Sequence, residues 1–372
     1  MKLSDICDVY SGYALKEFNN EGDGFPVIKI GNILSDGSLL LEDCQYSKEN
    51  INEKYFSKYG DIYVALSGAT TGKIGIMQSR EKHIINQRVG IVRKKDSDIP
   101  ESYIKYFLLH QTERILNDAS GCAQPNISPK QIALYEVPNY GNEAILSIVS
   151  SLDKISNIIE LRKQQLQQLV DLVKARFVDM FGEVETNIKG FNIKRMDECC
   201  KFIGGAQPNK SYFEYEKTDD NIRLIQIRDY KSDRFVTYIP KTLARKTCTA
   251  SDIMIGRYGP PIFQILGGIE GAYNVALMKA VPTDEFNVEY FRYFLKDEKL
   301  LHYLESFSQR TAGQDGIQID KLNEYPCLVP PMDLQNDFAA FVEQVDKSKV
   351  AVQKALDEAQ TLFDSLMQKY FG

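Results

Sequence analysis

The sequence predicts an α+β protein with two tandem mixed α/β globules, each followed by one long helix. Three observations support this fold class. Two 40-residue segments, 143–182 and 333–372, have helical periodicity. Short motifs ahead of the first segment recur ahead of the second, and the composition is that of ordinary soluble protein. At 372 residues, with 43% hydrophobic and 26% charged residues, the chain is long enough for two or three domains with sizeable cores.

The long helices are predicted from uninterrupted apolar patterns. Residues 143–182 contain no Gly or Pro before Gly182, and their apolar side chains recur at coiled-coil spacing. At 1.5 Å per residue this helix would be about 60 Å long, and a helix of that length needs a partner. Residues 333–372 carry a second apolar seam and also end in Phe-Gly. We therefore expect each helix to be the other's partner.

The regions that precede the two helices repeat each other more faintly. The clearest matched pairs are VIKIGNI (27–33) with LIQIRDY (224–230), GDIYVALSG (60–68) with SDIMIGRYG (251–259), and YIKYFL (103–108) with YFRYFL (290–295). The second pair reads in both copies as a short alternating strand closed by glycine. The chain is therefore interpreted as a tandem duplication.

Charge, cysteines and histidines narrow the function classes. A formal net charge of −6 argues against a protein that coats nucleic acid by bulk electrostatics, so any DNA binding must depend on local patches or on a partner. The seven cysteines contain no CxxC pair and the three histidines are far apart, so we expect no disulfide framework and no metal site. The absence of a signal-peptide core and of a long apolar run predicts a cytoplasmic chain.

LSGATTGKIG at 66–75 has some features of a phosphate-binding loop, because Gly72-Lys73 follow a run of small residues. Such a loop needs glycine at both ends of a four-residue span and a Ser or Thr after the lysine. Ser67 occupies the first glycine position and Ile74 follows Lys73, so the Mg²⁺-binding hydroxyl is missing. The second copy lacks the Gly-Lys pair. A nucleotide-dependent enzyme built around Lys73 is therefore kept only as an alternative.

The order of globule, helix, globule and helix, with GDIxxxxSG and GxxQPNIS (121–128), resembles the specificity subunit of type I restriction–modification systems. The resemblance covers essentially the whole chain. It implies two target-recognition domains, each reading one half of a bipartite DNA sequence. It also implies that the helices pack as an antiparallel coiled coil with pseudo-twofold symmetry. The implied segments are recognition domains at 1–142 and 183–332 and spacer helices at 143–182 and 333–372.

The resemblance also implies partners. These are double-stranded DNA and two modification (methyltransferase) subunits that dock on the helices, and restriction subunits are a further partner that it allows. The chain itself is expected to be non-catalytic and to hold no cofactor. An adenine methyltransferase needs an Asn/Asp/Ser-Pro-Pro-aromatic loop, whereas the nearest string is Gly259-Pro260-Pro261-Ile262. The other class of function left open is a coiled-coil scaffold whose globules bind proteins.

Candidate DNA contacts are polar side chains near strand ends and glycine turns, where loops can enter a major groove. In the first half they are Lys29, Asn32, Ser67, Thr70, Thr71, Lys73, Asn86, Gln87, Arg88, Gln124, Asn126 and Lys130. In the second half they are Gln226, Arg228, Tyr230, Arg257, Tyr258, Gln264, Asn274, Arg310 and Gln314. For each one the alternative is a solvated loop residue. Gln124 and Asn126 have a second alternative, in which their amides brace the globule against its helix.

Overall fold

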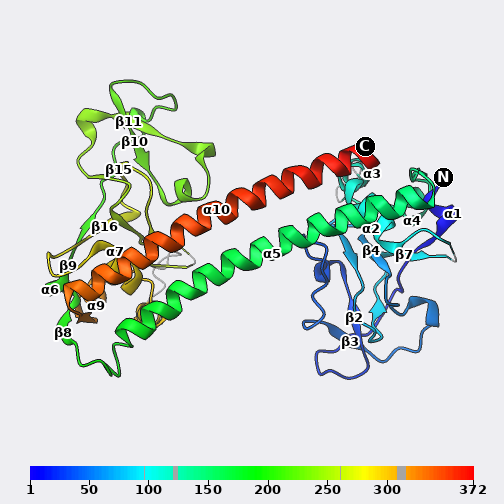
Figure 1. Ribbon diagram of the computed structural model, residues 1–372, viewed down its shortest axis with the longest axis horizontal. Coiled ribbons are helices and arrows are strands. Elements are labelled where there is room, and N and C mark those ends of the chain that lie inside the picture. The colour runs from blue at the N-terminus through cyan, green and yellow to red at the C-terminus, as the bar shows by residue number, and fades with distance from the viewer. Residues whose placement is uncertain (96, 120–124, 260, 308–315) are drawn as a thin grey trace. The chain divides into compact units, whose positions relative to one another are not determined.

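The structure is a computed structural model that describes residues 1–95, 97–119, 125–259, 261–307 and 316–372. The chain forms two compact units (Figure 1). Unit 1 contains residues 1–164 and 353–372, and unit 2 contains residues 165–352. Each long helix thus begins in one unit and ends in the other.

The two long helices are α5 (Asn142–Phe181) and α10 (Met332–Phe371), each 40 residues long (Figure 1). Each lies one residue earlier than the range expected from the sequence. Gly182 follows α5 with a φ of +70°, and its N–H donates to the Val178 carbonyl at 2.8 Å. A left-handed residue that bonds back into the last turn is the usual end of a helix, and glycine adopts it without steric cost.

The described residues of unit 1 form two sheets and four short helices. The antiparallel sheet has the order β1-β7-β4-β5, built from Cys7–Ser11, Val89–Lys94, Ile62–Ala65 and Ile74–Ile76. The second sheet has the order β3-β2-β6, from Gln45–Ser47, Phe25–Ile28 and Ile84–Ile85, and β2 and β6 run parallel. The short helices are α1 (Leu3–Ile6), α2 (Glu101–His110), α3 (Thr112–Ala119) and α4 (Pro129–Ala133), with 3-10 turns η1 (Ile30–Asn32) and η2 (Glu53–Tyr55).

Unit 2 repeats this plan. Its antiparallel sheet has the order β14-β13-β16-β9, from Gln264–Leu266, Ile253–Gly256, Leu277–Pro282 and Cys200–Gly204. The second sheet has the order β11-β10-β15-β12, from Tyr238–Pro240, Asn221–Ile225, Gly271–Tyr273 and Thr247–Cys248, and β10 and β15 run parallel. A further pair joins β17 (Pro326–Val329) to β8 (Asn192–Arg195). The helices are α6 (Met196–Cys199), α7 (Val288–Phe294), α8 (Glu298–Phe307) and α9 (Ile319–Glu324), with 3-10 turns η3 (Lys210–Tyr212), η4 (Ile227–Tyr230), η5 (Asp233–Phe235) and η6 (Lys241–Leu243).

The matched GDI and SDI motifs have the same local structure. In unit 1 the Asp61 carboxylate accepts a hydrogen bond from the Lys58 N–H at 2.8 Å, directly before β4. In unit 2 the Asp252 carboxylate accepts one from the Thr249 N–H at 2.8 Å, directly before β13. Each aspartate therefore closes a turn that starts a central strand, which gives the repeated Asp a structural reason.

Both long helices contribute side chains to each core. In unit 1, Phe371 of α10 is buried with its ring 5.1 Å from the ring of Tyr103 on α2. In unit 2, Phe181 of α5 is fully buried, and its ring lies 5.5 Å from Phe338 of α10 and 4.6 Å from Tyr290 of α7. Within each unit the helices are thus fastened to a globule by aromatic packing.

LSGATTGKIG forms the connection between the antiparallel strands β4 and β5, together with the first two residues of β5. Gly68 and Gly72 have φ values of +83° and +85°, and the Gly72 N–H donates to the Ala65 carbonyl at 2.9 Å. A phosphate-binding loop joins a strand to a helix whose N-terminus faces the phosphate, whereas this loop leads into a strand. The nucleotide-binding alternative has no structural basis here.

Candidate nucleic-acid interface

In unit 1, backbone hydrogen bonds bring three separate segments together. The Leu66 N–H, directly after β4, donates to the Arg88 carbonyl at 2.9 Å. The Leu66 carbonyl in turn accepts from the Ile127 N–H at 2.9 Å. A surface cavity of about 820 Å³ lies where these segments meet, and its lining contains the candidates Ser67, Gln87, Arg88 and Asn126, with Ser11, Leu66, Pro125, Ile127, Ser128 and Pro129.

The side chains of this cavity can donate to and accept from a polar ligand. Gln87, Arg88 and Asn126 are exposed, and the Ser67 hydroxyl is buried with no hydrogen-bond partner among the described residues. The Asn86 side-chain oxygen accepts from the Arg88 N–H at 3.2 Å, and this bond holds the turn that presents Gln87 and Arg88. Amide and guanidinium groups of this kind match the edges of bases in a major groove.

Two candidates of unit 1 have structural roles instead. Asn32 is only 7% exposed, and its side chain accepts from the Lys29 N–H at 2.8 Å and donates to the Leu40 carbonyl at 2.9 Å. Thr71 is 4% exposed, and its hydroxyl donates to the Gly68 carbonyl at 2.7 Å. The polar groups of both side chains are hydrogen-bonded within the fold, so we no longer expect either residue to contact DNA.

The other described candidates of unit 1 lie outside this cavity. Lys29 is half-buried, with its ammonium hydrogen-bonded to the Gln45 side chain and 3.8 Å from the centre of the Phe18 ring. Burial lowers the pKa of Lys29. Thr70 and Lys73 are half-buried in the β4–β5 connection, and Lys130 is exposed on α4.

Unit 2 brings its candidates together through matching bonds. The Asn274 N–H, after β15, donates to the Ile225 carbonyl of β10 at 3.1 Å, as the Asn86 N–H donates to Ile28 of β2 at 3.0 Å in unit 1. The Arg257 N–H donates to the Ala276 carbonyl at 2.9 Å. These bonds draw the ends of β10, β13 and β15 together.

The sequence match between Ser67 and Tyr258 extends to their strand contacts. Tyr258 forms an isolated β-bridge with Gly316, and Ser67 forms one with Asn126. Tyr258 carries an aromatic ring where Ser67 carries only a small hydroxyl, and the Arg257 guanidinium lies 5.5 Å from the centre of that ring. The two units thus share a backbone arrangement and differ in the side chains that it displays.

The remaining described candidates of unit 2 differ in how far their polar groups are engaged. Arg228 is exposed, and one guanidinium nitrogen donates to the Phe235 carbonyl at 3.4 Å. Gln226 donates to the Thr237 hydroxyl at 3.3 Å, and Gln264 donates to the Pro261 carbonyl at 3.0 Å. Tyr230 lines a cavity of about 440 Å³, and burial raises the pKa of its hydroxyl.

Three candidates, Gln124, Arg310 and Gln314, lie outside the residues that the structure describes. Polar residues that were not among the candidates lie beside the predicted ones. Ser11 and Ser128 line the unit 1 cavity, and Arg234 lies beside Phe235 and Arg228 in unit 2. For Arg234 a sequence signal exists, because Lys and Arg outnumber Asp and Glu around it.

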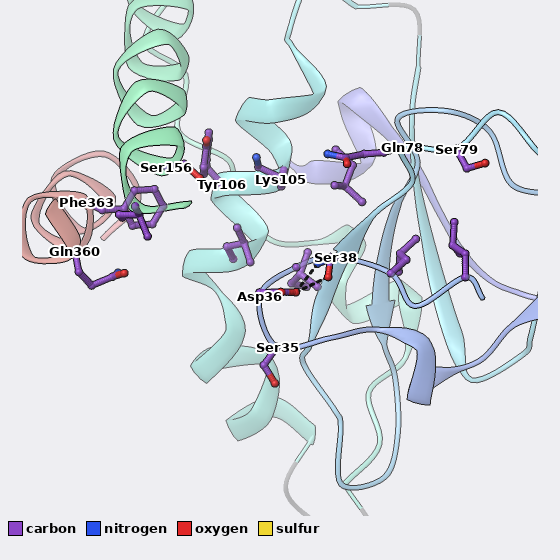
Figure 2. A pocket seen from close by; sticks show the side chains of 18 residues that line it. Ser35, Asp36, Ser38, Gln78, Ser79, Lys105, Tyr106, Ser156, Gln360 and Phe363 are labelled. Carbon is purple, nitrogen blue, oxygen red and sulfur yellow. Dashed lines mark hydrogen bonds between the residues drawn. The ribbon is translucent and has the colours of Figure 1, made fainter. Parts of the chain in front are cut away.

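A second cavity of unit 1, of about 580 Å³, lies against the long helices and contains none of the candidates (Figure 2). Figure 2 shows Lys105 and Tyr106 of α2, Ser156 of α5 and Phe363 of α10 around it, with Ser38 hydrogen-bonded to Asp36. Unit 2 has a cavity of about 440 Å³ against the same two helices, lined in part by Phe177, Tyr293 and Lys349.

These features define a class of protein in which two similar α/β units share two long helices and display different polar side chains from equivalent loops. Among the described residues, no helix is long and apolar enough to cross a membrane, and no group of three or more His, Cys, Asp or Glu residues could hold a metal ion.

Known proteins show which family the first part of the chain resembles. Residues 1–170 match the family described as the type I restriction modification DNA specificity domain. The chain is 23% identical over 178 residues to the EcoBI type I restriction enzyme specificity subunit of Escherichia coli, and the match covers 47% of this chain and 35% of that relative. The chain thus matches only about a third of that relative's length. The first 170 residues are therefore similar to the DNA specificity domain of type I restriction–modification systems.

Solved structures show the same fold over the whole chain. A crystal structure of a type I restriction–modification S subunit from M. genitalium has a TM-score of 0.59 at 15% identity, covering 100% of this chain and 95% of that one. A chain from a study of complex assembly and conformational transition in the type I system has a TM-score of 0.57 at 15% identity, covering 100% and 96%. At this identity the likeness is one of fold alone.

Proposed function

We propose that this chain is the DNA sequence-specificity subunit of a type I restriction–modification complex, in which each unit reads one half of a bipartite target. The observation that supports this most directly is the pair of equivalent loop sites. Both units close the sites with the same backbone bonds, from Asn86 to Ile28 and from Asn274 to Ile225. A shared scaffold with different displayed side chains suits a protein that reads two different half-sites.

The four-segment division follows from this proposal. Residues 1–142 and 183–332 are the two target-recognition domains, and residues 143–182 and 333–372 are spacer helices that pair as an antiparallel coiled coil with pseudo-twofold symmetry. The contact between Phe181 of α5 and Phe338 of α10 supports the antiparallel pairing, because it joins the end of one helix to the beginning of the other.

Two modification subunits are the proposed protein partners. Each unit has a cavity against the long helices, and each cavity contains the equivalent tyrosine of the YIKYFL and YFRYFL motifs, Tyr106 in one and Tyr293 in the other. Equivalent surfaces in the two copies suit two copies of one partner. The chain would contribute recognition, and its partners would carry the methyl transfer and, where a restriction subunit is present, the cleavage.

The proposal is tested by mapping methylated bases across a genome, in cells that carry this chain with modification subunits and in cells that lack the chain. We expect a bipartite methylated motif only when the chain is present. The chain purified alone should neither methylate DNA nor hydrolyse ATP. Methylation by the pure chain, or an unchanged methylome, would contradict the proposal. A scaffold function predicts association with partner proteins but no dependence of the methylated motif on the chain.

The base contacts of individual side chains can be tested at Gln87 and Arg88. Replacing either with alanine should relax base choice within one half-site and leave the other unchanged, because a bidentate contact contributes about 1–3 kcal/mol of discrimination. Binding to single-base variants of the target provides the measurement. Lys82→Ala is a suitable control, because Lys82 is exposed in unit 1 and does not line the cavity. Its ammonium pairs with the Glu53 carboxylate at a distance of 2.7 Å. Equal loss of affinity for every target variant would assign Arg88 to the DNA backbone instead.

A further inference from the structure

One segment of unit 2 carries an excess of positive charge in a chain with a formal net charge of −6. Residues 223–246 contain seven Lys and Arg and two Asp, a formal charge of +5. The matching segment of unit 1 is 26–55. Each segment begins inside the strand that pairs in parallel, β2 or β10. Each ends just before a residue that pairs with a later part of the same sheet, Phe56 with Ile84 or Thr247 with Ala272. The unit 1 segment contains three Lys and five acidic residues, a formal charge of −2.

The strand register places most of this charge at one end of a sheet. β10 and β15 run parallel with Ile225 opposite Tyr273, so their carboxyl ends meet at the same edge. β11 and β12 are antiparallel to these strands, so the residues that precede them lie at that edge too. Arg228 follows β10, Arg234 precedes β11, and Arg245 and Lys246 immediately precede β12. We call these four residues, with Phe235, the basic sheet end.

The charges of the basic sheet end are largely available to a ligand. All five residues are exposed. Among the residues that the structure describes, Arg234, Arg245 and Lys246 form no ion pair, and Arg228 has only a long one, 3.9 Å from the buried Asp229 carboxylate. The guanidinium groups of Arg228 and Arg234 lie 5.6 and 5.2 Å from the centre of the Phe235 ring, which is itself 56% exposed.

We propose that the basic sheet end binds the phosphate backbone of duplex DNA and supplies salt-sensitive affinity to unit 2. This rests on the proposed function. Guanidinium groups pair with phosphate oxygens through two parallel hydrogen bonds, and Arg is the residue best suited to this contact. Phe235 holds both side chains by cation–π contact and adds an apolar surface for the sugar edge. Gln226 and Asn274 lie at the same sheet edge, so backbone contact there would also set the register for base contact.

The test compares two variants of the full chain, binding a mixed-sequence DNA duplex at several salt concentrations. Arg234→Gln with Lys246→Gln removes two charges of the basic sheet end. Lys217→Gln with Lys241→Gln removes two exposed charges from the opposite end of the same sheet, before β10 and after β11. Each lost phosphate contact should reduce the slope of log affinity against log salt by about 0.9, so the first variant should lose about 1.8 and the control almost nothing.

The outcomes separate this inference from the proposed function. If both variants change the slope equally, or neither does, the basic sheet end is not the backbone contact. Such a result does not affect the proposed function, because the methylome experiment measures sequence choice independently of salt. The inference is supported if only the variant with Arg234→Gln and Lys246→Gln has a smaller slope of log affinity against log salt and its methylated motif keeps both half-sites. The basic sheet end then supplies affinity, and other residues supply specificity. Circular dichroism of both variants should match that of the unchanged chain, since every substituted side chain is exposed.

Discussion

Lengthening both long helices by four residues at the boundary between the units should change the distance between the recognised half-sites without changing the half-sites. The insertions duplicate residues 161–164 of α5 and 349–352 of α10, where unit 1 and unit 2 divide. Four helical residues add about 6 Å and about 40° of rotation. One base pair adds about 3.4 Å and about 34°, taking one DNA turn as about 34–36 Å and 10–10.5 base pairs.

We therefore expect the nonspecific spacer to grow by one base pair, or by two if the rise outweighs the rotation. Rotation should dominate, because a recognition domain turned away from its groove loses every base contact. A displacement of a few ångströms along the DNA can instead be absorbed by bending the DNA. Activity at the original spacing should fall by at least about 30-fold, since each lost base pair costs about 1–3 kcal/mol and more than one would be lost.

Methylome sequencing of the insertion variant measures both the spacing and the half-sites. A matched control inserts four residues after Gly22, an exposed position with open space around it. Full activity of the helix variant at the original spacing would show that the helices do not set the distance. An insertion near the end of α5 would be uninformative, because Met180 and Phe181 are part of the unit 2 core.

Replacing Asp61 with alanine should destabilise unit 1 by about 3–5 kcal/mol, because it leaves the Arg93 guanidinium buried and without its partner. Arg93 donates to the two Asp61 carboxylate oxygens, from Nε at 2.7 Å and from Nη2 at 2.6 Å. The Asp61 side chain is only 2% exposed and the Arg93 side chain 13%. Arg93 also donates to the Phe56 carbonyl at 2.7 Å, so it cannot turn towards solvent without breaking that bond. Chemical denaturation, followed by a probe in unit 1, measures the loss.

An exposed ion pair provides the control for this prediction. Glu53 pairs with Lys82 in the same unit, and their side chains are 67% and 53% exposed. Glu53→Gln should change the free energy of unfolding by no more than about 1 kcal/mol, because solvent screens such pairs. A similar small effect for Asp61→Ala would mean that Arg93 finds solvent or another partner, and the pair would then be of little structural importance.

The features predicted well from the sequence depend on local periodicity. The long helices were predicted within one residue of their bounds. This was possible because an unbroken apolar seam and a terminal glycine are both local features of the sequence. The β4 strand and its glycine turn were expected for the same reason. The role of Asn32 could not be predicted, since its amide bonds a carbonyl eight residues away, at Leu40. Arg245 and Lys246 were missed because only the pairing of β12 with β15 places them beside Asn274.

The division of the helices between the units has a consequence for synthesis on the ribosome. Unit 1 is discontinuous, because its core contains Met367 and Phe371 as well as Ile145 and Tyr103. Unit 2, by contrast, is continuous from residue 165 to residue 352. The unit that is translated first therefore completes its core last, and until then the apolar surface around Tyr103 lacks its cover. Once residues up to 352 have emerged from the ribosome, the chain carries a finished second unit and an unfinished first one. The first unit is therefore the one that chaperones and proteases would recognise.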